Sequence, residues 1–122
     1  MGHLVWKRIY DDLDVHEGYR ILIDRLWPRG IKKERAGLDY WAKEIAPTAD
    51  LRKAYHTETI DYDTFSAKYA AEIEANPTFG DFVALIRTKL TTQDVIMLYG
   101  MKEADKSQLP ILRKYVEKVL EK

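Results

Sequence analysis

The stretch LIDRLWPRG joins side chains that could do chemistry to a segment that looks buried. Asp24, Arg25 and Arg29 follow a run of aliphatic residues, and Pro28 and Gly30 end the stretch. Guanidinium groups bind phosphate or carboxylate through paired hydrogen bonds, and a neighbouring carboxylate can orient an arginine or accept a proton. Glycine lets the backbone approach a ligand closely. The pattern therefore predicts an anion-binding site at Arg25, Arg29 and Gly30, with Asp24 as a weak catalytic candidate.

A second stretch, VIMLYGMKE, has the same form, because a buried-looking run leads into Tyr99, Gly100 and Lys102. Ligands of open parallel sheets bind beyond the carboxyl ends of the strands. If both runs are parallel strands, Lys102 joins the two arginines at one edge of the sheet. Tyr99 is then a weak candidate for proton transfer.

Trp27 and His56 complete the set of candidates that the residue types suggest. Trp27 could stack on a ligand, and His56 could act as a general base. Each candidate also has a plain structural reading. Asp24 could only pair with an arginine, Trp27 could plug the core, and a cationic His56 would suit a helix C-terminus. Lys102 lies in a charged loop that is solvated by default.

The elements that must position these residues read as an α/β pattern. Residues 4–10 and 19–27 and the run VIMLY after Asp94 are typical of strands, the last two covered on both faces. Between the second and third of these strands, the spacing predicts four helices: in the second half of 31–47, from Thr48 to residue 55 or 56, from Asp61 through residue 73, and from residue 79 to 90. A fifth helix is predicted after Ser107, with Pro110 in its first turn. We expect one domain over residues 1–122, with a small, mainly parallel sheet of three to four strands flanked by about five helices.

Composition narrows the functional classes. Twenty basic and twenty acidic residues give no net charge, which argues against a nonspecific nucleic-acid binder, although a local basic patch would still allow one. There is no cysteine, which excludes disulfides and a thiol nucleophile and is compatible with the cytoplasm, where we expect the protein. No apolar run is long enough for a membrane span, so we expect no membrane partner. No spacing of a metal site appears, and no particular cofactor is indicated.

Taken over its whole length, the sequence resembles the YeaO-like family, a domain of unknown function (DUF488). The resemblance is carried by KRIYD, GYRILIDRLWPRGIKKE, LDYWAKEIAPTADLRKAYH, FSAKYAAEI and DVIMLYGMK, which together cover nearly the whole chain. The resemblance implies a compact α/β domain and supplies no reaction. The motif residues that match by position are Arg8, Gly18, Tyr19, Arg20, Asp24, Arg25, Trp27, Pro28, Arg29, Gly30, Trp41, Pro47, Leu51, Arg52, Phe65, Tyr69 and Tyr99.

The resemblance adds Arg52 to the ligand-binding candidates and marks one departure. Relatives usually place an asparagine and a small residue before the last helix, whereas this chain has ADKSQLP at 104–110. Ser107 or Gln108 could replace that asparagine as a hydrogen-bonding group.

Two functional hypotheses follow. The first is a small enzyme or ligand-binding protein that acts on a phosphorylated or carboxylated small molecule. The alternative is a noncatalytic module that binds nucleic acid or protein through basic stretches and tryptophans, at Lys7, Arg8, Lys32, Lys33, Arg35, Trp6, Trp27 and Trp41. A purely structural role is supported only by the lack of a complete catalytic set. The sequence does not determine the oligomeric state.

Overall fold

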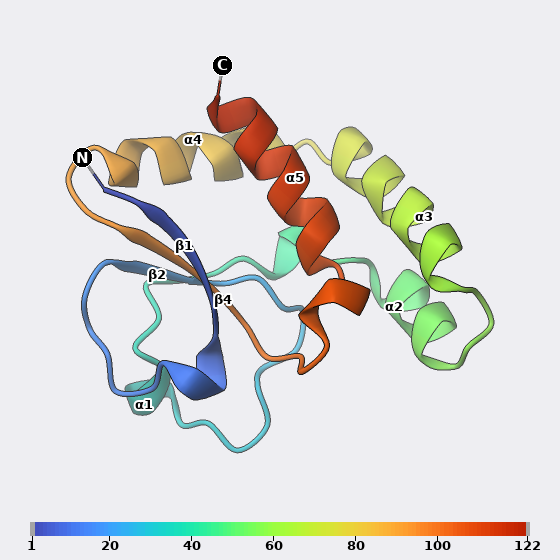
Figure 1. Cartoon of the computed structure of the whole chain (residues 1–122), viewed down its shortest axis with the longest axis horizontal. Coiled ribbons are helices and arrows are strands. Elements are labelled where there is room, and N and C mark those ends of the chain that lie inside the picture. Colours follow the sequence, from blue (N-terminus) through green and yellow to red (C-terminus); the bar gives the residue numbers. More distant parts are fainter. Residues whose placement is uncertain (1, 122) are drawn as a thin grey trace.

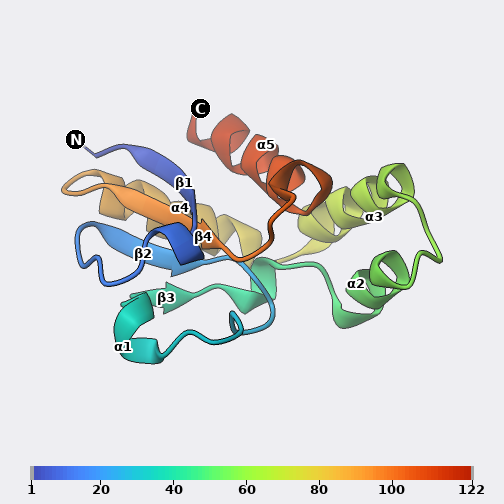
Figure 2. The same cartoon turned by 60° about the horizontal axis from the view of Figure 1, so that its bottom comes forward.

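A four-stranded parallel sheet organises the chain, which the computed structural model describes for residues 2–121. The strands are β1 (Leu4–Arg8), β2 (Tyr19–Leu22), β3 (Tyr40–Trp41) and β4 (Val95–Tyr99), in the order β1-β4-β2-β3 (Figure 1; β3 is labelled in Figure 2). β4 pairs with β1 on one side and with β2 on the other. The expected α/β class and mainly parallel sheet are therefore confirmed, and the fourth strand is the short β3.

Alternating side chains of β4 supply two separate hydrophobic clusters. Val95 and Met97 belong to the larger cluster, whereas Ile96 and Leu98 belong to the smaller one on the opposite face. Both faces of the strand are thus buried, which explains why its sequence is an unbroken apolar run rather than an alternating one.

The two faces of the sheet are covered very differently. The larger cluster packs under α2 (Ala49–His56), α3 (Tyr62–Ala75), α4 (Phe79–Leu90) and α5 (Leu109–Leu120). The smaller cluster is covered by the 3-10 turn at Ile9–Asp11, the short α1 (Lys33–Ala36) and loop residues such as Leu13, Trp27 and Leu38. Figure 2 shows α1 and α5 on opposite sides of the sheet, with α2 and α3 beyond the carboxyl ends of the strands.

Helix starts largely follow their sequence signals. Thr48 accepts a hydrogen bond from the Leu51 amide, and Asp61 accepts one from the Thr64 amide, as N-caps do. Pro110 lies in the first turn of α5, as predicted. The predicted N-cap of α5, Ser107, lies one residue before the observed N-cap, which is Gln108. The Ser107 hydroxyl nevertheless accepts a hydrogen bond from the Leu109 amide at 3.1 Å.

The prediction of a helix in the second half of residues 31–47 is wrong. The segment forms β3 and then a 3-10 turn at Lys43–Ile45. Its apolar residues have helical spacing but serve different clusters, since Leu38 and Trp41 pack on the smaller cluster while Ala42 and Ile45 belong to the larger one. In an extended strand paired with β2, these side chains can reach the clusters on both faces of the sheet. A helix would place all of them in one apolar stripe that faces a single cluster.

Two predicted strands are also longer than the observed ones. β1 ends at Arg8 rather than at residue 10, because the chain turns into a 3-10 helix at Ile9. β2 ends at Leu22, although the Ile23 amide still donates to the Leu98 carbonyl at 3.0 Å. The residues after Ile23 are therefore free to form the wall of a site instead of a strand.

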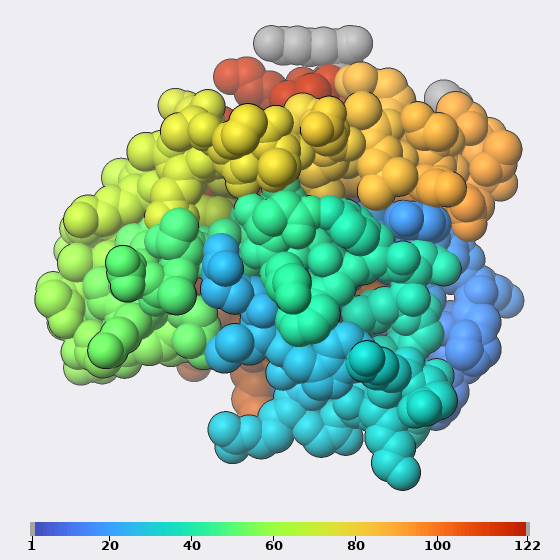
Figure 3. Space-filling model, turned by 180° about the vertical axis from the view of Figure 1, so that it is seen from behind, coloured from blue at the N-terminus to red at the C-terminus, as the bar shows by residue number. Residues whose placement is uncertain are grey.

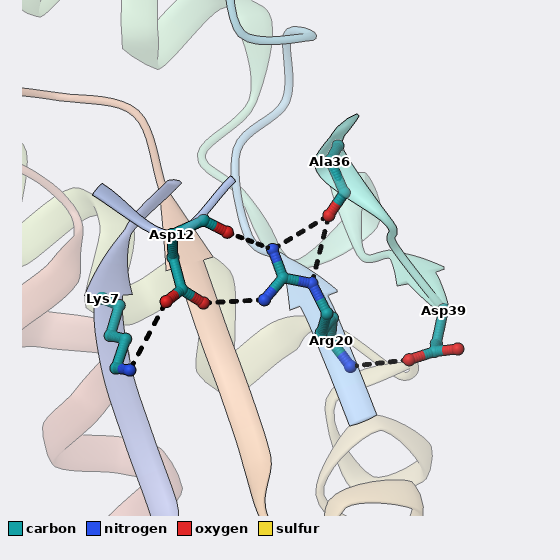
Figure 4. Close-up of polar contacts among 5 residues, drawn as sticks. All are labelled: Lys7, Asp12, Arg20, Ala36 and Asp39. Carbon is teal, nitrogen blue, oxygen red and sulfur yellow. Dashed lines mark hydrogen bonds and ion pairs between the residues drawn. The ribbon is translucent and has the colours of Figure 1, made fainter. Parts of the chain in front are cut away.

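A buried arginine fastens the thin cover to the sheet. Arg20 on β2 is fully buried, and its Nη1 donates to Asp12 Oδ2 at 2.7 Å (Figure 4). Its Nε and Nη2 both donate to the Ala36 carbonyl, at 3.1 and 2.9 Å, and Nη2 also donates to the Asp12 carbonyl at 2.8 Å. Because the guanidinium and its carboxylate are paired and hydrogen-bonded, their burial is tolerated.

We expect Arg20→Gln to lower the free energy of unfolding by about 3–5 kcal/mol, because it leaves the buried Asp12 with only the longer ion pair to the half-exposed Lys7, at 3.4 Å. The nearby Arg35–Asp14 pair, with both side chains more than half exposed, is the matched control, and Arg35→Gln should leave the stability almost unchanged. Urea denaturation followed by circular dichroism measures both. Equal effects of the two substitutions would contradict this account.

Candidate functional site

A cavity of about 610 Å³ opens at the carboxyl ends of β2 and β4. Its walls are the segment after β2 (residues 24–29), the residues before α2 with the middle and C-terminal end of α2, and the segment from Gly100 to the start of α5. The back view in Figure 3 shows the blue segment after β2 facing the green residues of α2, with orange residues of the loop after β4 behind them. This is the edge at which ligands of parallel sheets bind.

Asp24 joins two walls of this cavity and contacts the end of β3. Its Oδ2 accepts from the Gly100 amide at 2.8 Å, and its Oδ1 accepts from Gln108 Nε2 at 3.1 Å. Its main-chain carbonyl accepts from Trp41 Nε1 at 2.6 Å. A Cβ at residue 100 would lie 3.1 Å from Asp24 Oδ2, so glycine allows this close approach.

Burial raises the pKa of Asp24 to about 6, although the hydrogen bonds from Gly100 and Gln108 and the charge of Arg52 act in the opposite direction. The two hydrogen bonds therefore do not fully replace the lost hydration of the carboxylate. A carboxyl group with a pKa in this range exchanges its proton near neutral pH, which a general acid or base requires.

Three arginines line the cavity, and each has donors that no protein group uses. Arg25 donates through Nε to the Pro47 carbonyl at 2.8 Å and through Nη2 to the Ala46 carbonyl at 3.4 Å, which leaves Nη1 available. The guanidinium groups of Arg29 and Arg52 form no hydrogen bond or ion pair within residues 2–121, as far as the structure describes them. Arg29 is exposed, whereas Arg52 on α2 is half-buried.

Trp27 and His56 also line the cavity. Trp27 Nε1 donates to the Ile31 carbonyl at 2.7 Å, and its ring meets that of Trp41 edge to face, with centroids 5.4 Å apart. The half-buried Trp27 thus holds its turn in place as well as lining the cavity. His56 is exposed at the last residue of α2, where a cationic imidazole suits the helix dipole.

Gly30, Tyr99 and Lys102 are not among the residues that line this cavity. Gly30 has a φ of +80°, and a Cβ added there would have no atom within 4 Å, so the turn alone accounts for a glycine. The half-buried Tyr99 packs against the larger cluster, and Lys102 is exposed. Their predicted roles stay predictions.

Several cavity residues have little or no signal in the sequence. Gln108 is expected only as a possible substitute for an asparagine, yet it contacts Asp24 across a separation of 84 residues. Tyr10 donates from its hydroxyl to the Arg29 carbonyl at 2.8 Å, and Tyr55 donates to the Lys106 carbonyl at 2.8 Å. Only the position of residues 104–110 after a strand end could have indicated Gln108. No local pattern indicates the two tyrosines.

Metal and membrane sites find no support in the part of the chain that is described. Within residues 2–121, no three His, Asp or Glu side chains converge as a metal site would require. No helix there combines the length and apolarity needed to cross a bilayer.

Comparison with known proteins now identifies the family. Residues 3–122 match a family model described as the inactive DUF488-N3 subclade. The chain belongs to the DUF488 family. It is 45% identical over 106 residues to the uncharacterized protein YeaO of Escherichia coli K12, which covers 87% of this chain and 90% of that protein. It is 34% identical over 89 residues to the uncharacterized protein Mb3100c of Mycobacterium bovis, covering 73% of this chain and 71% of that protein. No solved structure shows a significant match.

The raised pKa of Asp24 has a consequence for stability. A carboxyl group whose folded-state pKa lies above its ordinary value of 3.8 binds its proton more tightly in the native state. The native state therefore loses stability relative to the unfolded chain as pH rises from about 4 through about 6. At pH values above this window, the free energy of unfolding is lower by about 3 kcal/mol because of this shift.

Asp24→Asn should relieve this loss, because the amide carries no charge and can keep both hydrogen bonds after the Gln108 amide rotates. We expect the variant to be more stable than the wild type at pH 8, by up to about 3 kcal/mol, and nearly equal to it at pH 4. Urea denaturation at a series of pH values measures the difference. A wild type that is as stable as the variant at pH 8 would show that the carboxylate is not strained by burial.

Proposed function

We propose that this protein binds a small oxyanion, on a phosphorylated or carboxylated compound, in the cavity at the carboxyl ends of β2 and β4. The observation that carries the proposal is Arg52, a half-buried guanidinium that lines the cavity and makes no hydrogen bond or ion pair within residues 2–121. The more distant charge of Asp24 acts on it. Desolvating a cation without a direct partner is costly, so a site of this kind gains most from an anion that enters it.

The neighbouring arginines support the same ligand. Arg25 has its Nη1 available, and Arg29 has its whole guanidinium available on the facing wall. A charge-assisted hydrogen bond contributes roughly 1.5–3 kcal/mol, so two or three such bonds are enough for specific binding of a small anion. Two exposed acids, Glu58 and Glu103, also line the cavity and would exclude a ligand with extensive negative charge.

The proposal is one of binding rather than catalysis. Asp24 and His56 stay candidates for proton transfer, but the description of the matching family model as inactive favours a protein that recognises its ligand without converting it. A cytoplasmic location stays a prediction.

The alternative of a nucleic-acid or protein-binding module has weaker support. The basic residues of α1 lie outside the cavity, and Arg35 among them is already paired with Asp14. Trp27 and Trp41 pack against each other and donate their indole hydrogens to backbone carbonyls, so they are not free stacking platforms.

Titration with inorganic phosphate at low ionic strength, followed by isothermal calorimetry and by amide chemical shifts, tests the proposal. We expect saturable binding that shifts the amides around residues 24–29, 52 and 100. Arg52→Gln should weaken it at least tenfold, because it removes a partly desolvated cation.

Arg113→Gln is the control, since Arg113 is an exposed arginine of α5 outside the cavity. It should leave the phosphate affinity unchanged. Equal losses in the two variants, or binding that a short DNA duplex reproduces with the same dependence on salt, would refute a specific small-anion site.

A further inference from the structure

The carboxylate of Asp24 lies in the same cavity as the three arginines, which creates a conflict for any anionic ligand. An oxyanion held by those arginines would lie near a second negative charge in a partly buried place. Two negative charges that share such a site repel each other, so one of the two groups takes up a proton. A proton held between them removes the repulsion. The ligand and Asp24 must therefore be considered together.

Asp24 has the capacity to hold such a proton. A carboxylate offers about four acceptor positions, and the Gly100 amide and Gln108 Nε2 occupy one on each oxygen. The side chain is only partly buried and lines the cavity, so further acceptor positions face the ligand space.

We propose, on the basis of the function proposed above, that Asp24 is the specificity-determining residue of this cavity. It shares one proton with the bound oxyanion and thereby selects phosphoryl groups, which carry or readily take up a proton, over sulfate. The shared proton lies on a hydrogen bond between an oxygen of the ligand and an oxygen of Asp24.

Phosphate and sulfate differ in whether they can supply the proton that is shared with Asp24. Inorganic phosphate keeps a proton throughout the neutral range, and a phosphate monoester takes one up with a pKa of about 6. Sulfate has nearly the same shape but offers no proton at any pH at which proteins are folded. A phosphoryl ligand therefore brings the required proton, whereas sulfate can be accepted only after Asp24 takes one from solvent.

Gln108 allows Asp24 to serve in either protonation state. Its Nε2 donates to the ionised carboxylate at 3.1 Å. In the free protein, rotation of the same amide by half a turn presents Oε1, which accepts a hydrogen bond from a protonated Asp24. With the ligand bound, the single proton of Asp24 lies toward the ligand, and Nε2 donates to Asp24 again. The Gly100 amide continues to donate to the other oxygen in both states.

Other titratable or charged groups also face this space and must be separated from Asp24. They are Tyr10 after β1, Arg25 and Arg29 after β2, Arg52, Tyr55 and His56 on α2, Glu58 after α2, and Glu103 and Lys106 after β4. The buried Tyr69 on α3 does not line the cavity but lies close enough for the charge of Asp24 to raise its pKa. A change in the charge of any of these groups, His56 included, acts on phosphate and sulfate through the same cavity, so the ratio of the two affinities isolates the effect of Asp24.

The experiment measures the dissociation constants of inorganic phosphate and sulfate from pH 5 to pH 8 at constant ionic strength. We expect the preference for phosphate to grow with pH above about pH 6, the pKa of Asp24, by up to tenfold per pH unit. In Asp24→Asn the steep rise should be lost, so that the ratio changes only through the ionisation of phosphate itself, and in His56→Gln it should follow the wild type.

A second measurement uses the unmodified protein, so that it does not depend on the folding of a variant. Calorimetry in two buffers of different ionisation enthalpy should show that sulfate binding at pH 7.5 takes up close to one proton, while phosphate binding takes up far less. A preference that does not vary with pH in the wild type, or equal proton uptake for both anions, would overturn the role of Asp24 and leave the anion site intact. The proposed anion site itself would be refuted by a different result, namely that the Arg52→Gln variant binds both anions as tightly as the wild type.

Discussion

The two hydrogen bonds that the Asp24 carboxylate accepts are the constraint on which the cavity depends. They connect the end of β2 to the Gly100 amide after β4 and to Gln108 at the start of α5. Because one carboxylate accepts both bonds, it fixes how far apart two strand ends and a helix start lie. Burial removes water from the same carboxylate by more than these bonds replace, so the residue that shapes the cavity is also one whose ionisation is costly.

The arginines of this chain show how one residue type takes two opposite roles. Arg20 has its guanidinium surrounded by Asp12 and the Ala36 carbonyl, and its five donors are largely used within the protein. Arg52 has a similar side chain on a helix beside a cavity and no such partners among residues 2–121. Burial, geometry and partners, rather than residue type, separate a structural arginine from a binding one.

The sequence predicted the parts of this structure that depend on local pattern. The apolar run at Val95–Tyr99 and the caps at Thr48 and Asp61 have a single physical reading, and the structure agrees with it. Residues 40–41 do not, because their neighbours serve clusters on both faces of the sheet and only the packing shows this. In the cavity, the pair of strand ends was predictable from parallel topology, whereas the contact between Asp24 and Gln108 joins residues far apart in the chain and leaves no local trace.

The strand order has a consequence for the time at which this protein can fold as it is synthesised. β1 and β2 are made early, but they do not pair with each other, because β4 lies between them and is made more than seventy residues after β2. Until that strand arrives, both early strands have unsatisfied backbone edges and their apolar faces lack a central partner. The complete sheet therefore cannot form until the last third of the chain has been synthesised.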